Sequence, residues 1–243
     1  MSETAERRRR GGLLGFVRDL VIILVVAFLI SFLLKTFLVR SFYIPSSSME
    51  QTLQVNDRIL VNQLVPNVVG VERGDVVVFR DPGGWLYPKA MATTPSAFEK
   101  VLQTVGLAAD TTHDYVVKRV IGVGGDRVTC CDANGRIEVN GVPLDEPYIV
   151  IPEGKTRASE IDFDVTVPEG SVWVLGDNRY ASKDSRYNQD QPGKGFVSES
   201  EIVGRAFLLN WPLDHFGWLG RPESTFTGVE EAAERPAEAP SAQ

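Results

Sequence analysis

The chain opens with a long apolar run and then changes to short segments of strand-like pattern. Residues 20–39 read LVIILVVAFLISFLLKTFLV, with Lys35 as the one charged residue. At about 1.5 Å rise per residue, such a run spans roughly 30 Å, the thickness of a bilayer's hydrocarbon core. A cleavable signal sequence should end in a small-x-small site, but residues 35–44 (KTFLVRSFYI) contain none. We therefore predict an uncleaved transmembrane anchor over 20–39, in preference to a buried helix or a removed signal.

After Arg40 the pattern is typical of β-strands. Short runs rich in β-branched residues are separated by turn signals such as Asn134-Gly135 and Asn140-Gly141. Many short strands joined by close turns favour a mainly β, antiparallel domain over alternating βαβ units. The predicted strands are Asp57–Val61, Gly74–Phe79, Tyr115–Val120, Arg127–Thr129, Arg136–Val139 and Val172–Leu175.

Two segments interrupt this pattern. Residues 95–107 have the apolar spacing of a short helix, within an insertion over 82–114. From residue 221 the chain is rich in Ala, Pro, Glu and Ser, so we expect a disordered acidic tail. The predicted organisation is a basic N-terminus (1–19), a membrane anchor (20–39), a β domain (40–220) and the tail (221–243).

Composition and charge narrow the classes of protein. The hydrophobic content of 43% is ordinary for a globular chain and excludes both a multi-span membrane protein and a disordered one. The net charge of −7 opposes sequence-independent binding of nucleic acid. Arginines 7–10 and Arg18 precede the apolar run, whereas Lys35 and Arg40 lie at its far end. By the positive-inside rule we expect a cytoplasmic N-terminus and a β domain beyond the membrane.

The two cysteines, Cys130 and Cys131, are adjacent in the sequence. Two cysteines alone do not make a zinc site, and His113 and His215 lie at no recognisable metal spacing. Two interpretations stay open: buried thiols, or a vicinal disulfide in an oxidising compartment. Neither predicts a metal.

Three segments carry candidate chemistry. Residues 42–49 (FYIPSSSM) place three serines between apolar residues just beyond the anchor. Lys118 lies within a β-branched strand, where burial would lower the pKa of its amine and make it available as a base; the alternative is that it faces solvent. Residues 175–186 form a polar loop, either at the surface or behind an active site. Few histidines and no Gly-x-Ser-x-Gly give a Ser-His-Asp hydrolase little support.

Behind an N-terminal anchor, the segments Pro45–Met49, Gly74–Phe79, Val117–Gly122 and Gly176–Arg179 occur in this order. The chain thereby resembles bacterial signal peptidase I, a membrane-bound Ser/Lys endopeptidase that removes signal peptides from exported proteins. The resemblance extends from the anchor to about Phe207. It implies an antiparallel β-sheet catalytic domain of the signal-peptidase type.

The resemblance also assigns the catalytic roles. Ser48, directly before Met49, matches the nucleophile, and Lys118 matches the general base. The Ser46 hydroxyl and the Ser48 backbone N–H match the oxyanion hole. Where the family often carries proline two residues after the methionine, this chain has Gln51.

Supporting and substrate-binding positions follow in the same way. Ser182 matches the serine that orients the lysine amine. Asp184 and Arg186 match an ion pair that supports the loop, with an exposed salt bridge of small value as the alternative. An extended peptide points alternate side chains the same way, so two shallow pockets would select small residues at −1 and −3. The residues that match these pockets, or alternatively belong to an ordinary β core, are Phe42, Ile44, Met49, Val78, Val116 and Val117.

The resemblance therefore implies a single-pass serine endopeptidase of the bacterial cytoplasmic (cell) membrane. It would cleave signal peptides from exported preproteins without metal or organic cofactor, contact membrane lipid, bind no nucleic acid and act as a monomer. Trp211, Phe216 and Trp218 lie either at the membrane interface or in the core. Two other functions compete: a self-cleaving Ser/Lys protein of the repressor type, which the anchor and the acidic charge oppose, and a membrane-anchored β domain that only binds peptides.

Overall fold

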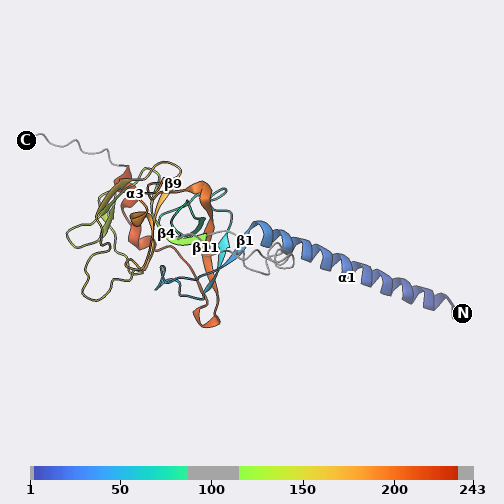
Figure 1. Ribbon diagram of the computed structural model, residues 1–243. Helices are drawn as coiled ribbons and strands as arrows, with labels where there is room; N and C mark the ends of the chain where they lie inside the picture. The colour runs from blue at the N-terminus through green and yellow to red at the C-terminus, as the bar shows by residue number, and fades with distance from the viewer. Residues whose placement is uncertain (1–2, 87–114, 235–243) are drawn as a thin grey trace, which may run out of the picture.

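A single long helix precedes the β-rich part of the chain. The computed structural model describes residues 3–86 and 115–234. Helix α1 (Glu3–Phe37) projects away from the remaining structure (Figure 1). Its segment Gly15–Phe32 is long and apolar enough to cross a membrane, and it is not buried inside the protein. The helix ends before the predicted boundary at 39, because Val39 already pairs with Asn62 in a sheet.

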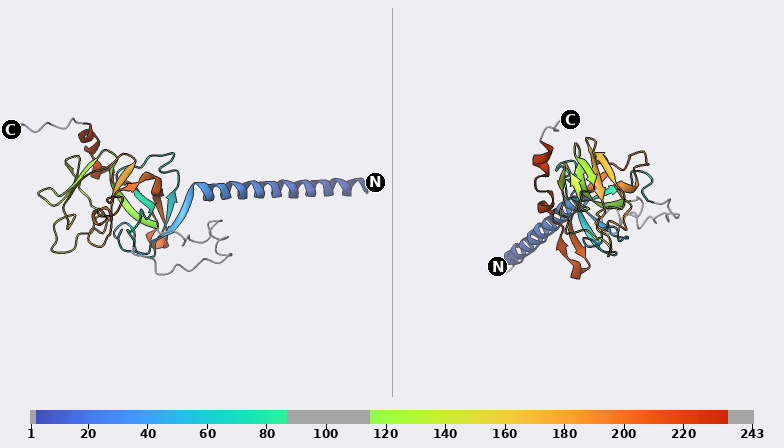
Figure 2. Two further views of the ribbon diagram at one scale, coloured as in Figure 1. Left: turned by 45° about the horizontal axis from the view of Figure 1, so that its top comes forward. Right: turned by 90° about the vertical axis from the view of Figure 1, so that its left-hand side faces the viewer.

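A large antiparallel sheet forms the centre of the β-rich part, and the left-hand view in Figure 2 shows the chain passing from the end of α1 into this part. Its strands lie in the order β1-β2-β11-β3-β4-β9-β10, and β12 pairs with β11. The strands are β1 (Val39–Tyr43), β2 (Arg58–Asn62), β3 (Val76–Arg80), β4 (Tyr115–Val123), β9 (Ser171–Leu175), β10 (Val197–Ser198), β11 (Ile202–Trp211) and β12 (Gly217–Trp218).

A second antiparallel sheet has the order β7-β6-β5-β8. It contains β5 (Arg127–Cys130), β6 (Ile137–Val139), β7 (Val142–Pro143) and β8 (Phe163–Thr166). Short 3-10 helices are η1 (Ser185–Tyr187), η2 (Glu199–Glu201), η3 (Leu213–His215) and η4 (Glu223–Phe226), and a last helix is α3 (Val229–Ala233). The predicted mainly β, antiparallel fold with one N-terminal apolar helix is confirmed. The short helix predicted for 95–107 lies outside the described residues.

The large sheet curls so that side chains from its first and fifth strands meet. In a flat sheet β1 and β4 would be four strand spacings apart, about 19 Å. Yet the ring centroids of Phe42 on β1 and Tyr115 on β4 are 5.0 Å apart. One buried apolar cluster fills the curl and includes Phe42, Ile59, Val61 and Val78. The curl brings the segment after β1 close to β4.

The C-terminal segment corrects one expectation, because the predicted disorder from residue 221 does not hold for 221–234. Val229 is fully buried in the core cluster formed with the second sheet, and Phe226 packs against the same cluster. Arg221 donates from Nε to Asp75 Oδ1 at 2.6 Å. A few apolar and charged side chains thus hold a segment whose composition is otherwise typical of disorder.

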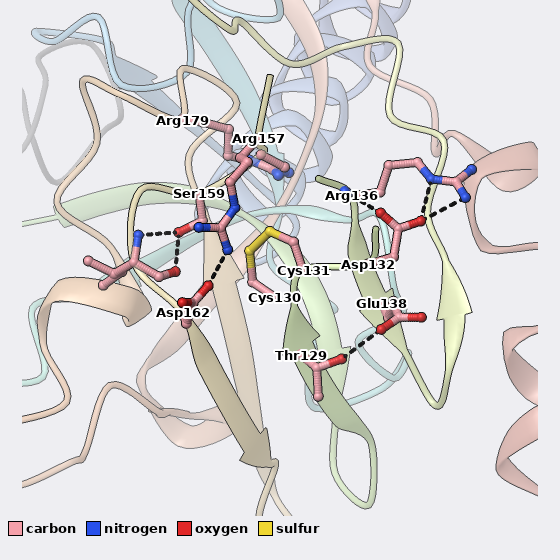
Figure 3. The surroundings of a disulfide bond; sticks show 12 residues. Thr129, Cys130, Cys131, Asp132, Arg136, Glu138, Arg157, Ser159, Asp162 and Arg179 are labelled. Carbon is pink, nitrogen blue, oxygen red and sulfur yellow. Dashed lines mark hydrogen bonds and ion pairs between the residues drawn. A yellow bond between two sulfur atoms is a disulfide. The ribbon is translucent and has the colours of Figure 1, made fainter. Parts of the chain in front are cut away.

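Cys130 and Cys131 form a vicinal disulfide at the end of β5 (Figure 3). Of the two alternatives, the structure therefore has the disulfide. Beside it, Asp132 accepts a hydrogen bond from Arg136 Nε at 2.9 Å. No group of three His, Cys, Asp or Glu residues in the described part of the chain is placed to hold a metal ion.

Candidate active site

The curled sheet brings Ser48 and Lys118 into contact. Lys118 on β4 donates from Nζ to Ser48 Oγ at 2.6 Å and to the Val117 carbonyl at 2.9 Å. Ser48 is 9% exposed and Lys118 is 4% exposed, so the alternative of a solvent-facing lysine is wrong. A neutral amine at this distance can take the serine proton, as a general base must.

The turn that carries Ser48 is held by its own backbone. Glu50 N donates to the Ser47 carbonyl at 3.0 Å, and Leu53 N donates to the Met49 carbonyl at 2.8 Å. Gln51 has φ 82°, a left-handed conformation that the ring of proline cannot adopt. The absence of proline at this position therefore matches the local backbone.

Burial sets the protonation of the lysine. Desolvation lowers the pKa of Lys118 from 10.5 to about 8, against the opposing effect of the Asp184 and Asp177 carboxylates. The Arg186 guanidinium lowers it further. At neutral pH a larger fraction of the amine is thus unprotonated than for an exposed lysine.

Ser46 and Ser182 both lie near the serine and lysine. Ser46 is exposed, and its Oγ is 3.4 Å from Ser48 Oγ. Ser182 is 6% exposed, and its Oγ has no hydrogen-bond partner within the described ranges. Its predicted bond to Lys118 is therefore not formed in this structure. A Cβ added to Gly176 would lie 2.2 Å from Ser182 Oγ and 2.5 Å from the Ser48 carbonyl, so this glycine permits their close approach.

The Asp184–Arg186 pair is buried, not exposed. Arg186 donates from Nε to Asp184 Oδ1 at 2.8 Å and from Nη2 to Oδ2 at 2.7 Å, with both side chains fully buried. Although burial raises the pKa of the Asp184 carboxyl, the Arg186 guanidinium holds it below its usual value. Asp184 also accepts from Gly176 N at 3.0 Å, which fixes the backbone beside the lysine.

The structure adds residues that sequence reasoning missed. Arg119, beside the lysine, donates from Nε and Nη2 to Asp177 at 2.9 and 2.7 Å. It also donates from Nη2 to Thr52 Oγ1 at 3.1 Å, while Thr52 donates to Asp177 Oδ2 at 2.5 Å. We call Thr52, Arg119 and Asp177 the clasp, because they join the Ser48 turn to β4 and to the loop after β9. No local pattern marks Thr52 for this role.

A second buried arginine lies behind the clasp. Arg179 donates to Glu146 at 2.8 and 2.5 Å and to the Gly176 carbonyl at 3.1 Å. Tyr148 donates to Glu146 at 2.8 Å, and its ring is 4.0 Å from the Arg119 guanidinium carbon. Burial, followed by the Glu146 carboxylate, raises the pKa of the Tyr148 hydroxyl. The acidic side chains around the two arginines balance their charge, as buried ions require.

The predicted pocket residues divide between two clusters. Five of them share the cluster inside the curl: Phe42, Ile44, Met49, Val78 and, partly buried, Val117. Val116 belongs to a different cluster with Val77 and Phe79. The structure thus brings five of the six together beside the Ser48 turn and separates Val116 from them.

Comparison with known proteins identifies a matching family model and relatives whose names agree with it. A family model described as "Signal peptidase, peptidase S26" matches residues 17–211. The chain is 33% identical over 250 residues to a probable signal peptidase I of Mycobacterium leprae (strain TN), covering 90% of this chain and 83% of that protein. It is 35% identical over 224 residues to signal peptidase I of Mycobacterium tuberculosis (strain ATCC 25618 / H37Rv), covering 83% and 74%.

A third relative is signal peptidase IB of Staphylococcus aureus (strain MRSA252), 33% identical over 218 residues, with 84% of this chain and 95% of that protein covered. The matched region includes the apolar part of α1 and both chemical groups in contact, the Ser48 hydroxyl and the Lys118 amine. The family model covers most of the chain, and the three relatives are matched over 74 to 95% of their own length. The chain belongs to the signal peptidase I family of serine endopeptidases.

Proposed function

We propose that this protein cleaves signal peptides with Ser48 as nucleophile and Lys118 as general base. The observation that carries the proposal is the 2.6 Å contact between a buried amine and a serine hydroxyl. The family membership supplies the reaction, and this contact supplies the two groups that the reaction needs.

The reaction follows from these two groups. Ser48 Oγ attacks the scissile carbonyl carbon while its proton passes to Lys118 Nζ, giving a tetrahedral intermediate and an ammonium. Lys118 then returns the proton to the leaving amine as the peptide C–N bond breaks. A water, deprotonated by the same amine, hydrolyses the acyl-enzyme and regenerates Ser48. One amine thus performs the base and acid steps that histidine performs in a triad.

The oxyanion of the intermediate needs donors. We assign them to the Ser48 backbone N–H and the Ser46 hydroxyl, since Ser46 Oγ lies 3.4 Å from the nucleophile. Ser182, buried beside Gly176, is the third serine of the site, and we assign it to the positioning of the Lys118 amine during turnover. Asp184 and Arg186 support the loop that carries Ser182.

Substrate selection follows from the cluster inside the curl. Phe42 lies on β1, Ile44 directly follows β1, and Val78 lies on β3. All three belong to the cluster next to the Ser48 turn. Shallow pockets lined by these apolar side chains would accept alanine at the −1 and −3 positions of the substrate. Larger side chains would clash with the pocket walls. We therefore propose an Ala-x-Ala preference in the signal peptides of exported preproteins.

We further propose a single-pass topology with the N-terminus in the cytoplasm. The arginines before α1's apolar segment favour this orientation. Exposed aromatic side chains near η3 would then meet the outer lipid surface: Trp211, Phe216 and Trp218 are 51, 56 and 75% exposed. Unchanged association of an anchor-free Trp211→Ala/Trp218→Ala protein with lipid vesicles would contradict the interfacial role of these tryptophans.

We also propose that the protein acts as a monomer. Sedimentation of the full-length protein in detergent tests this oligomeric state.

The decisive experiment is a cleavage assay with a purified preprotein that carries an Ala-x-Ala site. Wild-type protein in detergent is expected to cut after the second alanine, and EDTA is expected to leave the rate unchanged because serine and lysine supply nucleophile and base. Ser48→Ala and Lys118→Met should each lower kcat by at least about 10³-fold. The matched control is Lys155→Met, which removes a lysine that is half exposed and paired with Glu160.

Two outcomes would contradict the assignment. If Ser48→Ala and Lys118→Met both still process the preprotein, other groups carry the reaction. If the wild-type protein binds the preprotein but never cuts it, the protein is a peptide-binding module.

A further inference from the structure

The segment 221–229, which we call the C-terminal strap, contacts the turn before β3 of the large sheet and the buried cluster of the second sheet. At its start, Arg221 pairs with the buried Asp75 at 2.6 Å and also with Glu72. Gly74 lies directly under the strap: a Cβ added there would be 2.9 Å from Pro222 and 3.1 Å from the Phe226 ring. The strap therefore contacts both residues of the Gly74-Asp75 turn, one by packing and one by charge.

The Gly74-Asp75 turn is itself hydrogen-bonded to Arg119 and Val120, the two residues that follow Lys118. Gly74 N donates to the Val120 carbonyl at 2.8 Å, and Val120 N donates to the Asp75 carbonyl at 2.9 Å. The Gly74 carbonyl accepts from Arg119 Nη1 at 2.9 Å. Arg119 is the arginine of the clasp, so a shift of this turn would be transmitted to the residue next to Lys118.

A second attachment reaches the opposite side of the site. Thr225 is 3% exposed and donates from Oγ1 to the Asp145 carbonyl at 2.7 Å. The next residue, Glu146, holds Arg179, which donates to the Gly176 carbonyl at 3.1 Å. Gly176 is the residue against which Ser182 and the Ser48 carbonyl are packed.

The end of the strap is inserted into the core. Val229 is fully buried in one cluster with Ile121 of β4 and Leu175 of β9. These residues lie three positions after Lys118 and one before Gly176. The strap is thus attached to β4, which carries Lys118, and to β9, which leads into the loop of Gly176 and Ser182.

We propose that the C-terminal strap positions Lys118 against Ser48, with Phe226 and Arg221 as its positioning residues. The inference rests on the proposed function, because it concerns the lysine's role as base. Neither residue touches the reacting atoms. Each acts on Gly74-Asp75 and through it on Arg119, so the strap should affect turnover more than substrate affinity.

The expected effects follow from the geometry. Phe226→Ala removes the ring that packs on Gly74. Arg221→Gln removes the guanidinium that lies 2.6 Å from the Asp75 carboxylate and leaves Arg205, at 3.4 Å, as its remaining cation. Each should lower kcat by roughly tenfold, since small misplacements of reacting groups are costly, while KM changes less than about twofold. A looser site also admits water to the lysine, so the midpoint of the pH–rate profile should move to higher pH.

Matched controls separate positioning from general stability. Val165→Ala trims a partly buried residue that packs against the same cluster from β8, and Arg127→Gln breaks the exposed pair with Asp164. Both should leave kcat and the pH midpoint as in the wild type. Phe226→Leu should recover most of the loss.

All full-length proteins are assayed in detergent, at least 15 °C below the Tm of the least stable variant, with the Ala-x-Ala preprotein. A lowered kcat with a raised pH midpoint, limited to Phe226→Ala and Arg221→Gln, supports the proposal. If Phe226→Ala and Arg221→Gln both have the kcat and the pH midpoint of the wild type, the proposal is wrong, whatever their Tm. Failure of the proposed function would show differently, as a wild-type protein that does not cut or a Lys118→Met protein that does.

Discussion

Replacing Lys118 with methionine should stabilise the fold at neutral pH while abolishing cleavage. Methionine has a similar length and no charge to desolvate. Burial lowers the pKa of Lys118 from 10.5 to about 8. Below pH 8 the folded protein must protonate a buried amine that an unfolded chain protonates freely. Each pKa unit corresponds to about 1.4 kcal/mol, so the lysine costs about 3 kcal/mol of folding free energy at pH 6.5.

The sign of the pH dependence is defined by the lowered pKa. Between pH 8 and 10.5 the unfolded state binds more protons than the folded state, so wild-type stability rises with pH across that window. Above 10.5 the lysine is neutral in both states and its cost disappears. Methionine also loses the hydrogen bonds to Ser48 and to the Val117 carbonyl, about 1 kcal/mol each, but that loss depends little on pH.

The assay is guanidinium unfolding of both full-length proteins in detergent, followed by tryptophan fluorescence, at pH 6.5 and 10.5. At each pH we subtract the unfolding free energy of the wild type from that of Lys118→Met. This difference should be about 3 kcal/mol larger at pH 6.5 than at pH 10.5. Other titrating groups are common to both proteins and cancel. A difference that is the same at both pH values would refute the reasoning, because the lysine would then not be desolvated in the fold.

Three further substitutions test other parts of the site. Gly176→Ala places a Cβ 2.2 Å from Ser182 Oγ and should lower kcat at least tenfold, measured by preprotein cleavage. Ser182→Ala should lower kcat by about 10- to 100-fold with little change in KM, and an unchanged kcat would exclude a role in orienting Lys118. Arg119→Gln leaves the buried Asp177 carboxylate without its charged partner and should destabilise the protein by about 3–5 kcal/mol in urea unfolding; a loss below about 1 kcal/mol would contradict a buried pair.

The sequence is sufficient to predict features that are local. The apolar run and the short motifs each occupy consecutive residues, so the anchor, the mainly β fold and the Ser48 and Lys118 segments can be identified without coordinates. Burial of Lys118 cannot be predicted in this way, since strand alternation alone leaves either face possible. The structure resolves it through the curl of the sheet, which depends on pairings between distant strands.

The residues that escaped prediction act over long sequence separations. Thr52 contacts Asp177 across 125 positions, and Arg221 contacts Asp75 across 146. Neither hydrophobic periodicity nor turn signals in the sequence predict contacts between residues so far apart. The strap shows the same limit, because its composition is typical of disorder while two side chains, Phe226 and Val229, provide its packing.

The position of β11 has a consequence for the timing of activity during synthesis. This strand, Ile202–Trp211, lies between β2 and β3 in the sheet, although β2 and β3 are neighbours in the sequence. Ser48 follows β1 and Lys118 lies on β4, on opposite sides of β11. Pairings of such high contact order form late, and a chain folds as it emerges. We therefore expect the contact between Ser48 and Lys118 to form only after β11 has been synthesised and has paired with β2 and β3.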